Sequence, residues 1–168
     1  MKRSYLFFTL LIFLSSCISQ KKISKTNRIN SVIGEARAYI GTPYKWGGND
    51  KRGIDCSGLL VRSFEYVEMK LPRVTSQQVE IGRNIKLWRN LNWLRGKPIS
   101  LNNSRKGDLV FFAFGKKKRE ITHVGLVSDI KNNSDIKFIH ASSSKGVIET
   151  QLIRDYYLNR IRKIKRVF

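Results

Sequence analysis

The sequence predicts an α+β fold in which helices come first and an antiparallel sheet follows. Apolar residues recur at helical spacing up to about residue 81, whereas runs rich in β-branched and aromatic residues follow Gly107. Helices and strands that are segregated in this way are typical of α+β folds rather than of alternating α/β folds. A length of 168 residues fits one domain with short additions. We therefore expect a single domain over residues 31–168.

The helical half is predicted from apolar periodicity and from residues that end helices. The expected helices cover residues 31–40, with Val32, Ile33, Ala36 and Ile40 on one side, then from near Cys56 to Val67, and residues 75–81, with Thr75 or Ser76 as N-cap. Gly41-Thr42-Pro43 ends the first helix, and the glycine-rich residues 44–53 are expected to form a loop.

The second half of the chain is predicted to form an antiparallel sheet. The expected strands cover residues 108–114, 121–130, 136–141, 146–151 and 161–168. Residues 131–134 separate the second and third of these strands and have the composition of a turn. We therefore expect these two strands to form a hairpin.

The first residues have the pattern of a secretory signal. Met1-Lys2-Arg3 is cationic, and Tyr5–Leu14 is an apolar run that is too short to span a bilayer comfortably. The run ends in Leu14-Ser15-Ser16-Cys17, which resembles a bacterial lipobox whose cysteine is lipidated and becomes the mature N-terminus. The alternative is an ordinary signal peptide in which Cys17 is incidental. We expect residues 1–16 to be the signal.

Residues 17–30 are expected to be a lipidated, flexible tether, because Ser, Lys, Gln and Asn dominate after Cys17. The expected protein is exported and held on a membrane through Cys17. The sequence after Cys17 lacks an acidic cluster, which favours an anchor that faces the periplasm, in the outer or the inner membrane. A Gram-positive outer leaflet remains open.

The formal net charge of +21 predicts attraction to anionic polymers, among them cell-wall material rich in carboxylate and phosphate. The alternative is simply a well-solvated surface. Charge alone would also suggest nucleic-acid binding, but export removes the protein from intracellular nucleic acid. We therefore expect no nucleic-acid partner, and we expect a monomer.

Cys56, His123 and His140 are the candidate chemical groups. The chain has two cysteines and two histidines, so lipidation of Cys17 would leave Cys56 as the only thiol, without a disulfide partner. A thiol, an imidazole base and a group that orients the base are what a cysteine nucleophile needs. The alternatives are a buried structural cysteine with structural histidines, or three zinc ligands with one open site.

The predicted elements place these groups favourably. A helix that begins near Cys56 would lower the pKa of the thiol and supply N–H groups for an oxyanion hole, and a nearby imidazolium would lower that pKa further. In the predicted hairpin, His123 and His140 lie near the same end of adjacent strands. If they are directly opposed, His140 can fix the tautomer of His123 and leave its other nitrogen to face Cys56. A register slip of one residue would break this geometry.

Six motifs in order resemble the NlpC/p60 family of papain-like cell-wall cysteine peptidases. They are Gly41-Thr42-Pro43-Tyr44-Lys45-Trp46-Gly47-Gly48, Asp55-Cys56-Ser57-Gly58, Leu71-Pro72-Arg73, Gly107-Asp108-Leu109-Val110-Phe111-Phe112, His123-Val124-Gly125 and Phe138-Ile139-His140-Ala141. The resemblance runs from about Val32 to the C-terminus. It implies a papain-like fold in which the nucleophile lies at a helix N-terminus that packs on the antiparallel sheet.

The resemblance also implies roles for individual residues. Cys56 would be the nucleophile, His123 the general base and acid, and His140 the orienting third member. Tyr44 would lie in the oxyanion region. The motif residues Asp55 and Ser57 would hold the free amine of a stem peptide, although helix capping by Asp55 is an equally open role.

The implied reaction is hydrolysis of an amide bond in peptidoglycan stem peptides through an acyl-enzyme, without a metal or organic cofactor. The bond would lie between D-glutamate and the diamino acid, or in the D-alanine–diamino acid cross-link. An amidase or acyltransferase on the same frame is an alternative, although permuted acyltransferases place histidine before cysteine. A non-catalytic wall-binding lipoprotein is another.

One segment departs from the family pattern. Residues 85–99 form a longer connection than the resemblance implies, and they carry Trp88, Arg89, Trp93 and Arg95. These side chains would either wall the substrate groove or pack on the edge of the domain.

Overall fold

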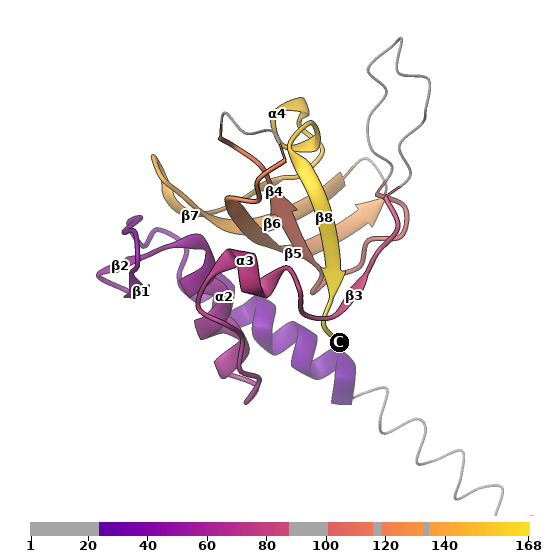
Figure 1. The fold of residues 1–168 in the computed structure, drawn as a ribbon. Coiled ribbons are helices and arrows are strands. Elements are labelled where there is room, and N and C mark those ends of the chain that lie inside the picture. Colours follow the sequence, from indigo (N-terminus) through magenta and orange to yellow (C-terminus); the bar gives the residue numbers. More distant parts are fainter. Residues whose placement is uncertain (1–23, 88–100, 116–118, 133–134) are drawn as a thin grey trace, which may run out of the picture.

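The structure is a computed structural model that describes residues 24–87, 101–115, 119–132 and 135–168. It confirms the α+β fold, with the longer helices packed on one face of an antiparallel sheet (Figure 1). The helices cover residues 24–38, α2 (Cys56–Glu65), α3 (Thr75–Gln78) and α4 (Asp155–Leu158).

The strands form one six-stranded sheet and one small ribbon. The sheet contains β3 (Arg83–Asn84), β4 (Leu109–Phe112), β5 (His123–Asn132), β6 (Asp135–Ser142), β7 (Gly146–Gln151) and β8 (Ile161–Arg166). Its order is β3-β8-β4-β5-β6-β7, and each neighbouring pair is antiparallel. The ribbon pairs β1 (Asn49–Asp50) with β2 (Gly53–Ile54) just before α2.

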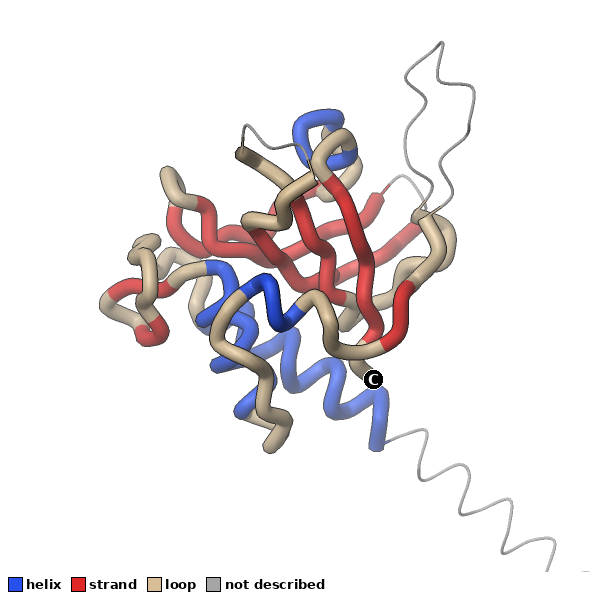
Figure 2. The backbone as a smooth tube through the Cα atoms, viewed as in Figure 1, coloured by secondary structure: helices blue, strands red, loops and turns tan. Residues whose placement is uncertain are grey.

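The sheet separates two apolar cores, and β4 shows how. Its four residues are all buried, because Leu109 and Phe111 face the helices while Val110 and Phe112 face the opposite side. The long helices lie on the first side, and α4 lies on the second (Figure 2). The sheet is therefore covered on both faces, which explains its nearly continuous apolar runs.

The N-terminal helix corrects the predicted tether. Residues 24–30 are helical, and the helix ends at residue 38 rather than 40. Ile29 packs against the helix-side core, and Arg28 donates a hydrogen bond to the carbonyl of Val67 at 3.1 Å. The prediction failed because residues 24–30 are mostly polar, and the helix packs on the core through few apolar side chains such as Ile29. Ile40 is 48% exposed, because the chain turns away at Gly41, whose φ is 89°.

The remaining differences from the predicted elements concern short segments. The ribbon β1–β2, strand β3 and helix α4 were not predicted, because each has two to four residues and is too short for a periodic pattern. Helix α3 is capped at Val74, whose side chain forms no capping bond, rather than at Thr75 or Ser76.

Some predictions fall outside the described residues. They include the signal over residues 1–16, the anchor at Cys17, and the side chains of Trp88, Arg89, Trp93 and Arg95. Within the residues that the structure does describe, no helix combines the length and the apolar character needed to cross a bilayer.

Candidate active site

Helix α2 begins at Cys56 because Asp55 caps it. Asp55 has an extended backbone, with φ −96° and ψ 176°, and its Oδ1 accepts a hydrogen bond from the N–H of Gly58 at 2.7 Å. Leu59, Leu60 and Phe64 then bury one side of the helix in the core. The cysteine is thereby fixed in the first turn, where backbone N–H groups have no helical acceptor.

Asp55 is also the centre of a buried hydrogen-bond network. Its Oδ1 accepts from the hydroxyl of Ser57 at 3.1 Å, and its two oxygens accept from the two Nη atoms of Arg73 at 2.9 and 2.8 Å. Its Oδ2 also accepts from the N–H of Gly47 at 2.9 Å. Burial alone would raise the pKa of Asp55, but the hydrogen bonds from Arg73 and Gly58 outweigh it and lower that pKa. The capping role of Asp55 is therefore present, and both carboxylate oxygens are engaged.

Arg73 connects three segments around the nucleophile. Besides Asp55, it donates to the hydroxyl of Ser57 at 2.9 Å and to the carbonyl of Gly48 at 3.0 Å. The glycine-rich loop passes so close to α2 that a Cβ on Gly58 would lie 2.4 Å from the carbonyl oxygen of Gly48. The glycine-rich loop, the start of α2 and the segment Leu71-Pro72-Arg73 therefore pack together as one unit.

The thiol of Cys56 is buried, with 7% of the residue exposed. Its Sγ lies 3.8 Å from Oγ1 of Thr75. Burial raises the pKa of Cys56 above its ordinary value, although hydrogen bonds from the N–H of Val124 and from Thr75 oppose the increase. The expected lowering of this pKa is therefore wrong for the free protein, because desolvation outweighs the donors around the sulfur.

His123 and His140 form a direct hydrogen bond across β5 and β6. Nε2 of His123 lies 2.9 Å from Nδ1 of His140, and the two rings are nearly perpendicular at 88°. The register pairs Leu126 with Ile139, so continuing it by one residue sets Gly125 opposite His140. The histidines are thus diagonal neighbours rather than directly opposed residues, and the diagonal is within reach of long or aromatic side chains.

The diagonal contact depends on Gly125 and Phe138. Phe138 is fully buried, and its ring stacks on His140 with a centroid distance of 4.6 Å and an interplanar angle of 9°. A Cβ on Gly125 would lie 2.6 Å from this ring. Glycine at this position therefore lets Phe138 lie where it supports the imidazole of His140.

Both imidazoles are neutral at neutral pH. Burial and the neighbouring His140 lower the pKa of His123 to about 3, and burial lowers the pKa of His140 to about 4. Among the hydrogen bonds of the described residues, none joins Sγ of Cys56 to a ring nitrogen of His123. The free protein therefore rests as a thiol and a neutral imidazole rather than as an ion pair.

Tyr157 is a site residue that the sequence did not reveal. Its hydroxyl lies 3.3 Å from Nε2 of His140, and its ring packs edge-on against Phe138 and His140. It comes from the short helix α4, which follows β7 and carries no family motif. Its place beside His140 depends on α4 packing against the same side of the sheet as the histidines. This packing could be predicted only if the strand order were known.

Two pockets meet at Tyr44 and Thr122. The Cys-side pocket, of about 650 Å³, is lined among others by Trp46, Asp55, Cys56, Ser57, Arg73 and Thr75. The His-side pocket, of about 450 Å³, is lined among others by His123, His140, Lys145, Arg154, Tyr156 and Tyr157. Burial raises the pKa of Tyr44, and the neighbouring Cys56 adds to this increase. Tyr44 therefore lies near the thiol, where the two pockets meet.

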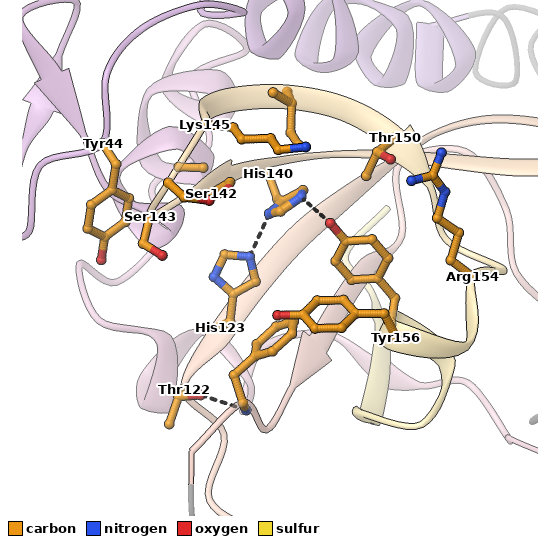
Figure 3. Close-up of a pocket in the computed structure, with 15 residues that line it drawn as sticks. Tyr44, Thr122, His123, His140, Ser142, Ser143, Lys145, Thr150, Arg154 and Tyr156 are labelled. Atoms are coloured by element: carbon orange, nitrogen blue, oxygen red, sulfur yellow. Dashed lines mark hydrogen bonds between the residues drawn. The ribbon is translucent and has the colours of Figure 1, made fainter.

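Zinc binding was the alternative for Cys56, His123 and His140. Within the described part of the chain, no group of three or more His, Cys, Asp or Glu side chains is arranged to hold a metal ion. The two histidine nitrogens that face each other are instead joined by a hydrogen bond. The arrangement suits proton transfer: the ring nitrogen of His123 that does not contact His140 points away from it, on the side of Tyr44 (Figure 3).

Comparison with known proteins agrees with this site. The chain is 39% identical over 137 residues to the murein DD-endopeptidase MepS/murein LD-carboxypeptidase of Escherichia coli, an alignment that covers 81% of this chain and 61% of that protein. It is 31% identical over 164 residues to the probable endopeptidase NlpC of Escherichia coli, covering 93% and 94% of the two chains. The chain therefore spans about three fifths of the first relative and nearly all of the second.

A solved structure and a family model point to the same group of proteins. A crystal structure of an NlpC/P60 family protein from Bacillus cereus superposes with a TM-score of 0.65 at 22% identity, covering 83% of this chain and 40% of that one. The family model described as NlpC/P60 family matches residues 41–166, which include Cys56, His123 and His140. With the fold, the motifs and the relatives in agreement, we conclude that the chain belongs to the NlpC/P60 family.

Proposed function

We propose that this protein is a peptidoglycan hydrolase, a cysteine endopeptidase that cleaves amide bonds in murein stem peptides. The observation that carries the proposal is the hydrogen-bonded pair of His123 and His140 beside a cysteine in the first turn of a helix. The names of its relatives, murein DD-endopeptidase and probable endopeptidase, support the substrate class. The bond would be D-glutamate–diamino acid or the D-alanine–diamino acid cross-link.

The reaction begins from the neutral thiol and the neutral imidazole. The thiol proton passes to Nδ1 of His123 as Sγ bonds to the carbonyl carbon. The imidazolium then gives this proton to the leaving nitrogen, and the C–N bond breaks to leave a thioester on Cys56. Water attacks the thioester after giving a proton to Nδ1, and this proton returns to sulfur as the acid product leaves.

The other site residues have supporting roles in this proposal. Backbone N–H groups in the first turn of α2 and the hydroxyl of Tyr44 stabilise the oxyanion. Asp55 and Ser57 line the Cys-side pocket and face the free amine of the stem peptide. Since Arg73 and backbone N–H groups already engage Asp55, its effect on a bound ammonium would be electrostatic attraction rather than an exclusive ion pair.

We further propose that the protein is exported and held on a membrane by lipid on Cys17, as a monomer that faces the periplasm. The lipobox-like sequence before Cys17 supports the anchor, and the net charge of +21 supports attraction to an anionic cell wall. Replacing Cys17 with Ala tests the anchor: the variant should appear in the soluble fraction, and unchanged membrane retention would contradict it. Binding to isolated wall that does not weaken with salt would contradict the electrostatic part.

The first experiment on activity incubates the purified full-length chain, in detergent, with purified peptidoglycan. Mass spectrometry of the products names the bond, and Cys56→Ala is the control. We expect new stem-peptide fragments that the control does not produce. A folded protein that yields no fragments from several wall chemistries would overturn the proposal in favour of an acyltransferase or a wall-binding lipoprotein.

A further inference from the structure

The His-side pocket carries positive charge and hydroxyl groups but no acidic side chain. Its polar wall consists of Ser142, Ser143, Ser144, Lys145, Thr150 and Arg154. Aromatic side chains, among them Tyr156 and Tyr157, form another part of its lining (Figure 3). A concave site with hydroxyl donors, two cations and an aromatic wall suits a small anionic group on an aliphatic stem.

The two cations of this pocket are available to a ligand. Lys145 and Arg154 are both exposed, and neither takes part in an ion pair within the described residues. Glu149, the acidic residue next to the pocket-lining Thr150, is engaged by Arg37 at 2.8 Å. Arg154 is close enough to Tyr157 to oppose the increase in the pKa of that phenol, which burial causes. The positive charge therefore lies next to the catalytic histidines.

The Cys-side pocket differs in charge. Its lining contains the acidic residues Asp55 and Glu120 as well as Arg73. A substrate that crosses both pockets thus meets acidic groups on the side of the nucleophile and only cationic groups on the side of the histidines. This difference sets the direction in which a peptide with a free amine at one end and a carboxylate near the other would bind.

The chemistry of the reaction assigns one pocket to each part of the substrate. His123 must give its proton to the leaving nitrogen, so the leaving residue lies against the histidines. We propose that the His-side pocket is a carboxylate subsite in which Lys145 and Arg154 bind a free carboxylate of the leaving residue. This inference rests on the proposed hydrolase function and adds to it the substrate class: stem peptides whose leaving diamino acid keeps its carboxylate, in preference to those in which it is amidated.

The test compares two synthetic stem peptides that differ only at this group, one with a carboxylate and one with a carboxamide on the leaving residue. The full-length chain in detergent should hydrolyse the carboxylate peptide with a kcat/KM about tenfold higher, as expected for the loss of a charge-assisted contact. The difference should lie mainly in KM, because the contact is present in both the bound substrate and the transition state.

The variants Lys145→Gln, Arg154→Gln and their double variant locate the effect. We expect them to lower kcat/KM for the carboxylate peptide and to leave the carboxamide peptide unchanged, so that the double variant no longer discriminates. Lys86→Gln, which removes an exposed charge that lines neither pocket, should keep the wild-type preference. Because Lys145 and Arg154 are exposed, a thermal melt should show that these variants remain folded.

The outcomes separate this inference from the function on which it rests. Hydrolysis of both peptides at equal rates, or a preference that survives in the double variant, would overturn the carboxylate subsite and leave the hydrolase in place. If neither peptide is cleaved and purified peptidoglycan yields no fragments, the proposed function itself fails. A preference lost equally in Lys86→Gln would mean general attraction by net charge and would also overturn the subsite.

Discussion

At the scale of single residues, the site depends on which nitrogen of each histidine carries a proton. To accept a proton from Cys56, Nδ1 of His123 must be bare, so Nε2 carries the hydrogen and donates it to Nδ1 of His140. His140 is then protonated at Nε2 and donates to the hydroxyl oxygen of Tyr157. With the opposite tautomers, His123 would present an N–H to the thiol. We therefore expect Tyr157 to act through His140 as a positioning residue.

Tyr157→Phe tests this role, because it removes the acceptor and keeps the ring that packs on Phe138 and His140. We expect kcat to fall by roughly threefold to tenfold, the effect of one neutral hydrogen bond, with little change in KM. The pH dependence of kcat should change as well, since the hydrogen bond favours one tautomer. Steady-state kinetics on a stem peptide provides the measurement.

Tyr156→Phe is the matched control, since Tyr156 lines the same pocket but has no hydrogen bond to His140 among the described contacts. A Tyr157→Phe variant with the wild-type kcat and pH profile would remove Tyr157 from the site. The same would follow if both variants lost the same amount, because the loss would then come from the pocket wall rather than from the tautomer.

Sequence reasoning found the residues with rare chemistry and missed those with common chemistry. Cys56, His123 and His140 stand out because the chain has so few cysteines and histidines. Arg73 and Tyr157 do not stand out among 33 Lys and Arg and six Tyr. The motif contains Arg73, but only the structure shows that it engages both oxygens of Asp55. The raised pKa of Cys56 could not be predicted from the sequence either, because it depends on how completely the sulfur is buried.

At the scale of elements, the hairpin of β5 and β6 shows what the pattern could and could not predict. Alternation and the turn residues predicted both strands, and the contact between the histidines follows from them. The irregularities between Val127 and Asp129 and between Ile130 and Asn132, which shift the pairing close to the turn, did not follow from the pattern. A pattern with a period of two carries no signal for a bulge, so the sequence left open whether His123 and His140 are directly opposed or diagonal neighbours.

Gly125→Ala tests the packing that supports the diagonal pair. The new methyl group would lie 2.6 Å from the ring of Phe138 and 3.0 Å from the carbonyl oxygen of Ile139, so the ring must move. We expect a loss of about 1–3 kcal/mol in the free energy of unfolding, which is typical of overpacking. We also expect a fall in kcat at temperatures where the variant is folded, because Phe138 stacks on His140. Denaturant unfolding and kinetics measure the two effects.

Gly34→Ala is the control for this substitution. Gly34 lies in the N-terminal helix, and its new methyl group would have no neighbouring atom within 4 Å, so alanine there should keep or increase stability. If Gly125→Ala is as stable and as active as Gly34→Ala, the methyl group is accommodated without moving Phe138, and the proposed support of His140 is wrong.

At the scale of the whole molecule, the buried histidines connect activity with stability. The native state keeps both imidazoles neutral, with pKa values lowered to about 3 and about 4, whereas in the unfolded chain their pKa returns to about 6.5. The unfolded state therefore binds more protons as the pH falls below 6.5, and stability decreases with decreasing pH in that range. Asp55 acts in the same direction at lower pH. Its pKa is lowered in the native state, so the stability that its carboxylate contributes is lost as the pH falls and the carboxylate is protonated.

We therefore expect the free energy of unfolding to fall between pH 6.5 and pH 5, with a slope that approaches about 1.4 kcal/mol per pH unit for each histidine. The chain has only two histidines, so no other side chain has an ordinary pKa in this window. Denaturant unfolding at several pH values measures the slope, and the variant His123→Gln/His140→Gln should be nearly flat over the same window. A wild-type curve as flat as that of the variant would show that the histidines are solvated and protonate freely. The proton transfer from thiol to neutral imidazole would then lose its physical basis, because an imidazolium of ordinary pKa could pair with the thiolate instead.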